Sequence, residues 1–145
     1  MTAKSTTSAF EPKGAHVNET LNLSFTTTRG TILMPNSRFE ALIYCGQTEC
    51  KQLDLNGSYL QGLYGQAMKV TGAAFLHEIT THATIDLNSA TIDGQLNCEK
   101  AVFEFEIGDA PNAQEAKIND GLIWQGVTVT KGTLYFAKRA QIRFV

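Results

Sequence analysis

The stretch "ATIDLNSATIDGQLNCEKAVF" (residues 83–103) decides the fold. Its apolar and small residues stand in pairs, two positions apart, separated by a few polar residues. The pairs are Ile85/Leu87, Ala90/Ile92, Leu96/Cys98 and Ala101/Phe103. This alternation indicates very short strands that turn every second side chain inward. The Asn, Ser, Asp, Gly and Lys residues between the pairs suit corners.

The same pattern occurs upstream when the sequence is shifted by 53 residues. The stretch "GTILMPNSRFEALIYC" (residues 30–45) then falls under residues 83–98, so that Ile32 meets Ile85 and Phe39 meets Ile92. A truncated copy follows near the end of the chain. We therefore expect copies starting near residues 17, 70 and 118, with equivalent residues stacked about two coils apart.

Short strands with few inward positions favour a solenoid over a sandwich, which needs longer strands and hairpin turns. In a solenoid, the backbone of each turn pairs with the turns above and below. The sequence predicts an all-β solenoid of about five or six coils, spaced about 4.8 Å apart. Residues 1–16 form a polar N-terminal segment, in which Phe10 and Pro12 are candidates to cap the first coil. Residues 17–145 form a single β-helix domain.

Part of this pattern resembles a known family. The motif Ala-x-Ile-x-Gly-x-Leu-x-Cys-x-x-Ala-x-Phe is matched by Ala90, Ile92, Gly94, Leu96, Cys98, Ala101 and Phe103. The chain thus resembles the bacterial pentapeptide-repeat-like family over about residues 17–145, most closely over 70–103 and less over 50–68. The resemblance implies a right-handed, quadrilateral β-helix and no reaction. Some members mimic DNA with an extended acidic face, which a net charge of −2 does not indicate here.

The composition excludes several classes of protein. Of 145 residues, 43% are hydrophobic and 18% charged, and no apolar run is long enough to cross a membrane. The first residues lack the apolar segment of a secretory signal, so we expect a cytoplasmic protein, with a processed secreted form as the alternative. We expect neither a membrane nor a nucleic-acid partner.

Residues 121–145 contain basic residues but no acid, which suggests a head-to-tail contact, an anionic partner or ordinary surface scatter. The basic residues are Lys131, Lys138, Arg139 and Arg143.

Histidines and cysteines give no strong motif. His77 and His82 are expected to be surface residues, because two histidines alone are a weak metal motif. Cys45 and Cys98 hold the same repeat position and are expected in one core ladder, two coils apart and too distant for a disulfide. Cys50 is expected at a corner as the more accessible thiol.

The acidic residues are expected to lie exposed to solvent on faces and corners of the β-helix instead of forming a glycosidase-like pair of carboxylates. They are Asp86, Asp93, Asp109 and Asp120. We expect no catalytic residue, cofactor or metal.

The tyrosines are the candidate binding residues. Tyr44 and Tyr135 lie between inward positions and should face outward, whereas Tyr59 and Tyr64 lie in the less regular stretch "GSYLQGLYGQ". Exposed tyrosines could stack on sugars or on a partner protein, although scattered exposed aromatics are also ordinary. Trp124 takes an inward position and is expected in the core.

The chain ends in the middle of a repeat. Ile142, Phe144 and Val145 would leave an open apolar coil, so we expect a homodimer whose C-terminal coils meet across a two-fold axis.

The sequence favours a non-catalytic protein-interaction or scaffold β-helix with an unidentified protein partner. The alternatives are a polymerising scaffold resembling bactofilins and a carbohydrate-binding or carbohydrate-processing β-helix.

Overall fold

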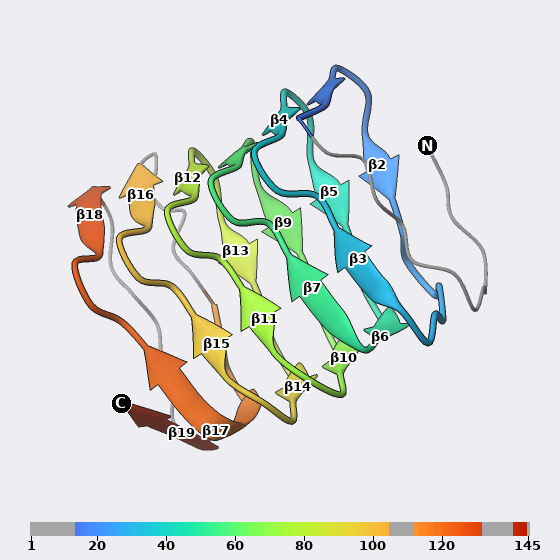
Figure 1. Ribbon diagram of the computed structural model, residues 1–145, viewed down its shortest axis with the longest axis vertical. Coiled ribbons are helices and arrows are strands. Elements are labelled where there is room, and N and C mark those ends of the chain that lie inside the picture. The colour runs from blue at the N-terminus through green and yellow to red at the C-terminus, as the bar shows by residue number, and fades with distance from the viewer. Residues whose placement is uncertain (1–13, 105–111, 132–140, 145) are drawn as a thin grey trace.

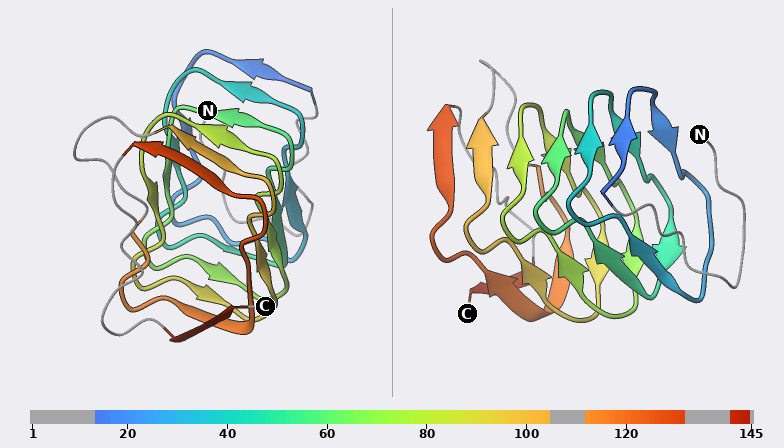
Figure 2. Two further views of the ribbon diagram at one scale, coloured as in Figure 1. Left: turned by 90° about the vertical axis from the view of Figure 1, so that its left-hand side faces the viewer. Right: turned by 45° about the horizontal axis from the view of Figure 1, so that its top comes forward.

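The structure is a computed structural model that describes residues 14–104, 112–131 and 141–144. Over these residues the chain is all-β, and its parallel strands wind into a solenoid of about five coils (Figure 1). This confirms the predicted all-β solenoid. The coils are four-sided, as the view along the stack shows (Figure 2, left), and the chain visits the four walls in the order A, B, C, D.

Each wall is a parallel ladder of short strands. Wall A contains β2 (Leu21–Asn22), β5 (Ile43–Tyr44), β9 (Leu63–Tyr64) and β13 (Ile85–Asp86). Wall B contains β6 (Glu49–Cys50), β10 (Lys69–Val70), β14 (Thr91–Ile92) and the first half of β17 (Lys117–Ile123). Wall C contains β3 (Thr31–Leu33), β7 (Gln52–Asp54), β11 (Ala74–Phe75), β15 (Leu96–Asn97) and the second half of β17.

Wall D contains β1 (His16–Val17), β4 (Arg38–Phe39), β8 (Tyr59–Leu60), β12 (Thr80–Thr81), β16 (Val102–Glu104) and β18 (Thr128–Lys131). The last strand, β19 (Gln141–Phe144), pairs with β17. No helix that could span a membrane is found in the described part of the chain.

The unit that repeats is half a coil, not the long block that the sequence suggested. Buried positions recur at i, i+2, i+5 and i+7, and the same pattern then restarts on the opposite wall. Leu21, Ile32 and Ile43, for example, open successive half-coils. Two half-coils make one coil, so that Leu21 pairs with Ile43 on the same wall.

The stacking expected from the long shift is therefore wrong. Ile85 pairs with Leu63 on wall A, whereas Ile32 lies on the opposite wall C. The shift spans five half-coils, and an odd number carries each residue to the opposite wall. Inward side chains have the same spacing on both walls. The shift therefore aligns apolar residues with apolar residues, although the aligned residues are not neighbours in the structure. The stretch 50–68, expected to be irregular, follows the half-coil pattern throughout.

A tight turn closes each half-coil at its i+2 to i+5 positions. The Thr26 N–H donates to the Leu23 carbonyl over 3.1 Å, and the residue between them at i+4, Phe25, has a φ of 61°. A positive φ at this place is typical of a type II turn, which glycine or asparagine adopts most readily. The same conformation recurs at the i+4 position of every described half-coil, as at Gln47 and Ala67.

The core is one continuous apolar column inside the four walls. Phe39, Leu60 and Phe103 are stacked members of wall D and are almost completely buried. Trp124 packs partly buried against this column, with its ring 5.4 Å from that of Phe103. Its expected core role is thus confirmed.

All three cysteines are free and buried. The expectation for Cys50 was wrong, because it is an i+7 residue whose side chain points into the core, not a corner residue. Cys45 and Cys98 are buried as expected, but they follow strands of opposite walls and do not share a ladder. Burial raises the pKa of each thiol to about 12.

Candidate functional site

The structure divides the candidate tyrosines between two walls. Tyr44 and Tyr64 are neighbours on wall A, with stacked rings 5.3 Å apart and an interplanar angle of 14°. Tyr59 points outward from wall D, and Tyr135 lies outside the described residues. A single face lined by Tyr44, Tyr59 and Tyr64 is therefore not formed, because a corner separates Tyr59 from Tyr64.

Wall D carries a row of interacting outward side chains that we call the mixed ladder. It consists of His16, Arg38, Glu40, Tyr59, His82 and Glu104. The Arg38 guanidinium carbon lies 3.9 Å from the centre of the Tyr59 ring, a cation–π contact. The Tyr59 ring in turn lies 5.1 Å from the imidazole of His82. The row thus runs from coil to coil along the solenoid.

A carboxylate contacts each end of the mixed ladder. Arg38 Nε donates to Glu40, and His16 Nε2 lies 3.1 Å from Glu40 Oε1. At the other end, His82 Nε2 lies 3.3 Å from Glu104 Oε2. The hydrogen bond from Arg38 holds the pKa of the Glu40 carboxyl below its usual value, and Glu40 raises the pKa of Arg38. These side chains are exposed, so the pairs orient one another more than they stabilise the fold.

The expected surface position of the other histidine is confirmed. His77 lies at the corner between walls C and D, where its Nε2 is 3.7 Å from Glu78 and 3.9 Å from Glu99. Lys100 joins the same cluster at 4.0 Å from Glu78. Within the described residues, no three histidine, cysteine or acidic side chains are placed to hold a metal ion.

One of the aspartates expected at the surface, Asp86, is buried. Asp86 is only 7% exposed and accepts hydrogen bonds from the Asn88 N–H and from Gln66 Nε2 at 2.9 and 2.6 Å. The expectation that Asp86 solvates a face is wrong, because its carboxylate closes a turn. Asp93 accepts a hydrogen bond from Asn119 at 3.2 Å, and Asp109 lies outside the described residues.

The residues expected at a dimer interface lie at one end of the stack. Ile142 and Phe144 belong to β19, whose backbone continues the ladder beyond β17, and Val145 is outside the described residues. Figure 1 shows β18 and β19 together at the C-terminal end of the solenoid.

Comparisons with known proteins give no relative: no family model, curated protein or solved structure matches the chain.

The mixed ladder could not be predicted from the shift of 53 residues, because one coil is much shorter than that shift. Arg38 pairs directly with Tyr59 between β4 and β8. Tyr44 pairs in the same way with Tyr64 between β5 and β9. An alignment shifted by one coil would have placed these side chains beside each other, whereas the longer shift placed Arg38 beside Thr91 of another wall.

Proposed function

We propose that this chain is a non-catalytic interaction β-helix that binds a partner protein through the mixed ladder of wall D. The observation that carries the proposal is the row in which Arg38, Tyr59 and His82, from three successive coils, contact one another. Arginine and tyrosine are enriched among the residues that dominate binding energy at protein interfaces. The likeness to the pentapeptide-repeat-like family and the cytoplasmic location remain proposals alongside it.

The rigidity of the wall supports this role. The backbone beneath the row is held by parallel pairing between β1, β4, β8, β12 and β16. Neighbouring side chains further restrict Arg38, which contacts both Glu40 and Tyr59. A partner would therefore meet side chains that already occupy one arrangement, and less conformational entropy would be lost on binding.

The test replaces Tyr59 with a photo-crosslinking phenylalanine in the cells that make the protein. A matched protein carries the same crosslinker at Phe75, an outward residue of wall C. We expect a protein that is captured from position 59 but not from position 75. Binding of that purified protein should then weaken at least thirtyfold in Arg38→Ala or Tyr59→Ala, the loss typical of a binding hot spot.

Lys69→Ala on wall B provides the control and should bind as the unchanged protein does. Equal binding by Arg38→Ala, Tyr59→Ala and Lys69→Ala would refute the proposal. Capture of the same proteins from positions 59 and 75 would refute it as well.

A further inference from the structure

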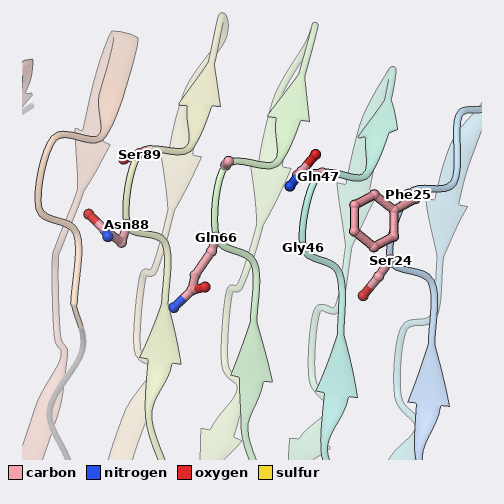
Figure 3. A pocket seen from close by; sticks show the side chains of 8 residues that line it. Ser24, Phe25, Gly46, Gln47, Gln66, Asn88 and Ser89 are labelled. Atoms are coloured by element: carbon pink, nitrogen blue, oxygen red, sulfur yellow. The ribbon is translucent and has the colours of Figure 1, made fainter.

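A shallow groove of about 350 Å³ runs along the corner between walls A and B. It crosses four coils and is lined by the two corner residues of each, at positions 24–25, 46–47, 66–67 and 88–89 (Figure 3). This corner groove is on a different part of the surface from the mixed ladder. Its volume is at the lower end of the range for small-molecule sites.

The lining is uncharged and rich in hydrogen-bonding groups. The hydroxyl of Ser24 and the side-chain amides of Gln47 and Asn88 make no hydrogen bond to the protein within the described residues. Gln66 is held by its hydrogen bond to Asp86, which places a carboxylate beside the groove. A neutral ligand fits this surface better than an anion, because no cation of the lining would offset that carboxylate.

Gly46 makes the groove hollow. The same corner position is occupied by Gln66 and Asn88 on the following coils, so a side chain is compatible with the turn. A Cβ added at Gly46 would meet no atom closer than the Gln66 carbonyl oxygen at 3.7 Å. The glycine is therefore not required by crowding.

An exposed aromatic ring stands next to this hollow. Phe25 is 73% exposed, the highest value among the large hydrophobic residues described. Figure 3 shows its ring leaning from the neighbouring coil toward the corner of Gly46 and Gln47. The positive φ of Phe25 belongs to the turn and recurs on each coil, so it is the outward ring and not the backbone that distinguishes this corner.

Two backbone donors beside the groove also find no acceptor among the residues that the structure describes. On other coils an Asn or Asp accepts the corner N–H, as Asn22 does from Ser24 and Asp86 does from Asn88, both at 2.9 Å. Tyr44 and Tyr64 take that place on the two coils between them, and their side chains cannot close the turn. Within the described residues, the N–H groups of Gly46 and Gln66 consequently donate to no protein oxygen.

The opposite corner gives a useful contrast. There the N–H groups of Asn56, His77 and Glu99 donate to side-chain oxygens at 2.9 Å. Open N–H donors, stacked tyrosines and an exposed phenylalanine thus meet at the corner groove and not at its counterpart on the same coils.

We propose that the corner groove binds a neutral oligosaccharide. A pyranose ring offers a C–H face to an aromatic ring and hydroxyl oxygens to N–H donors, which matches Phe25 on one side and Gly46 and Gln66 on the other. The free hydroxyls and amides of the lining match the remaining sugar hydroxyls. This site does not depend on the protein partner proposed for wall D.

The test follows the backbone amide signals of the ¹⁵N-labelled full chain by NMR. The probes are four neutral tetrasaccharides, namely cellotetraose, mannotetraose, maltotetraose and tetra-N-acetylchitotetraose, each at millimolar concentration. We expect at least one probe to shift the amide signals of Gly46 and Gln66 in a saturable way, while the signals of Asn56 and His77 stay in place.

Two variants test whether the sugar binds at the corner groove. Gly46→Gln fills the hollow with the residue that the next coil carries, and binding should fall at least tenfold. Phe25→Asn removes the ring with a residue that suits the turn, and binding should fall about three- to tenfold, the loss expected for one aromatic contact. His77→Gln at the opposite corner should bind as the unchanged protein does.

The proposal is overturned if none of the four tetrasaccharides shifts the Gly46 and Gln66 signals. It is also overturned if Gly46→Gln and Phe25→Asn, both folded by circular dichroism, bind as tightly as His77→Gln. Stronger binding of the anionic probe tetragalacturonate than of every neutral probe would likewise contradict it.

Discussion

Raising the pH should destabilise this protein through its three buried thiols. Burial raises the pKa of Cys45, Cys50 and Cys98 from 9.0 to about 12. Between these two values the unfolded chain releases the thiol protons and the folded chain keeps them. The unfolded state then binds fewer protons, so the free energy of unfolding falls as the pH rises.

The size of this effect follows from the pKa difference. At about one pH unit above the unfolded pKa, each thiol favours the unfolded state by about 1.4 kcal/mol. Three thiols together should lower the free energy of unfolding by about 4 kcal/mol between about pH 8 and about pH 10. That is a large part of the roughly 5–15 kcal/mol that is typical of a folded domain.

The assay is chemical unfolding followed by circular dichroism at the two pH values, with a phosphine reductant present. The control protein carries Cys45→Ala, Cys50→Ala and Cys98→Ala together. Alanine suits inward positions of this fold, as the buried Ala90 and Ala101 show. All other titratable groups are common to both proteins, so the difference between the two reports the thiols.

We expect the control protein to lose about 4 kcal/mol less stability than the unchanged protein over this pH interval. Each single Cys→Ala variant should remove about a third of the difference. If the unchanged protein and the triple variant lose equal stability, the buried thiols do not titrate as the structure implies, and the reasoning fails.

Two further predictions concern the corners and the C-terminal end. Gly94→Ala should lower the free energy of unfolding by about 1–3 kcal/mol, because its Cβ would lie 2.7 Å from the Gly72 carbonyl oxygen on the preceding coil. In Gly46→Ala the added Cβ would lie 3.7 Å from its nearest neighbour, so the free energy of unfolding should stay within about 1 kcal/mol of that of the unchanged protein. Both free energies are measured by denaturant titration, and equal losses in the two variants would argue against close coil contact at Gly94. Phe144→Asp on β19 should turn the expected homodimer into a monomer in light scattering, and identical masses for both proteins would contradict the dimer.

The sequence by itself determined the class of the fold. Pairs such as Ile85/Leu87 and Leu96/Cys98 turn alternate side chains inward, and the polar residues between them favour corners. These are local properties of the chain, because strand alternation and turn preference depend on neighbours a few residues away. They were therefore sufficient to predict short strands and a solenoid.

Only the tertiary structure decided which side chains meet. Inward residues look alike on opposite walls, so Ile32 aligned with Ile85 although backbone pairing places Leu63 beside Ile85. The neighbours of an outward residue depend on the length of a whole coil, which the corners set. That length stacks Tyr44 on Tyr64 and places Arg38 over Tyr59. Both candidate surfaces depend on this register, which is set by hydrogen bonds between coils and not by the order of residues within one.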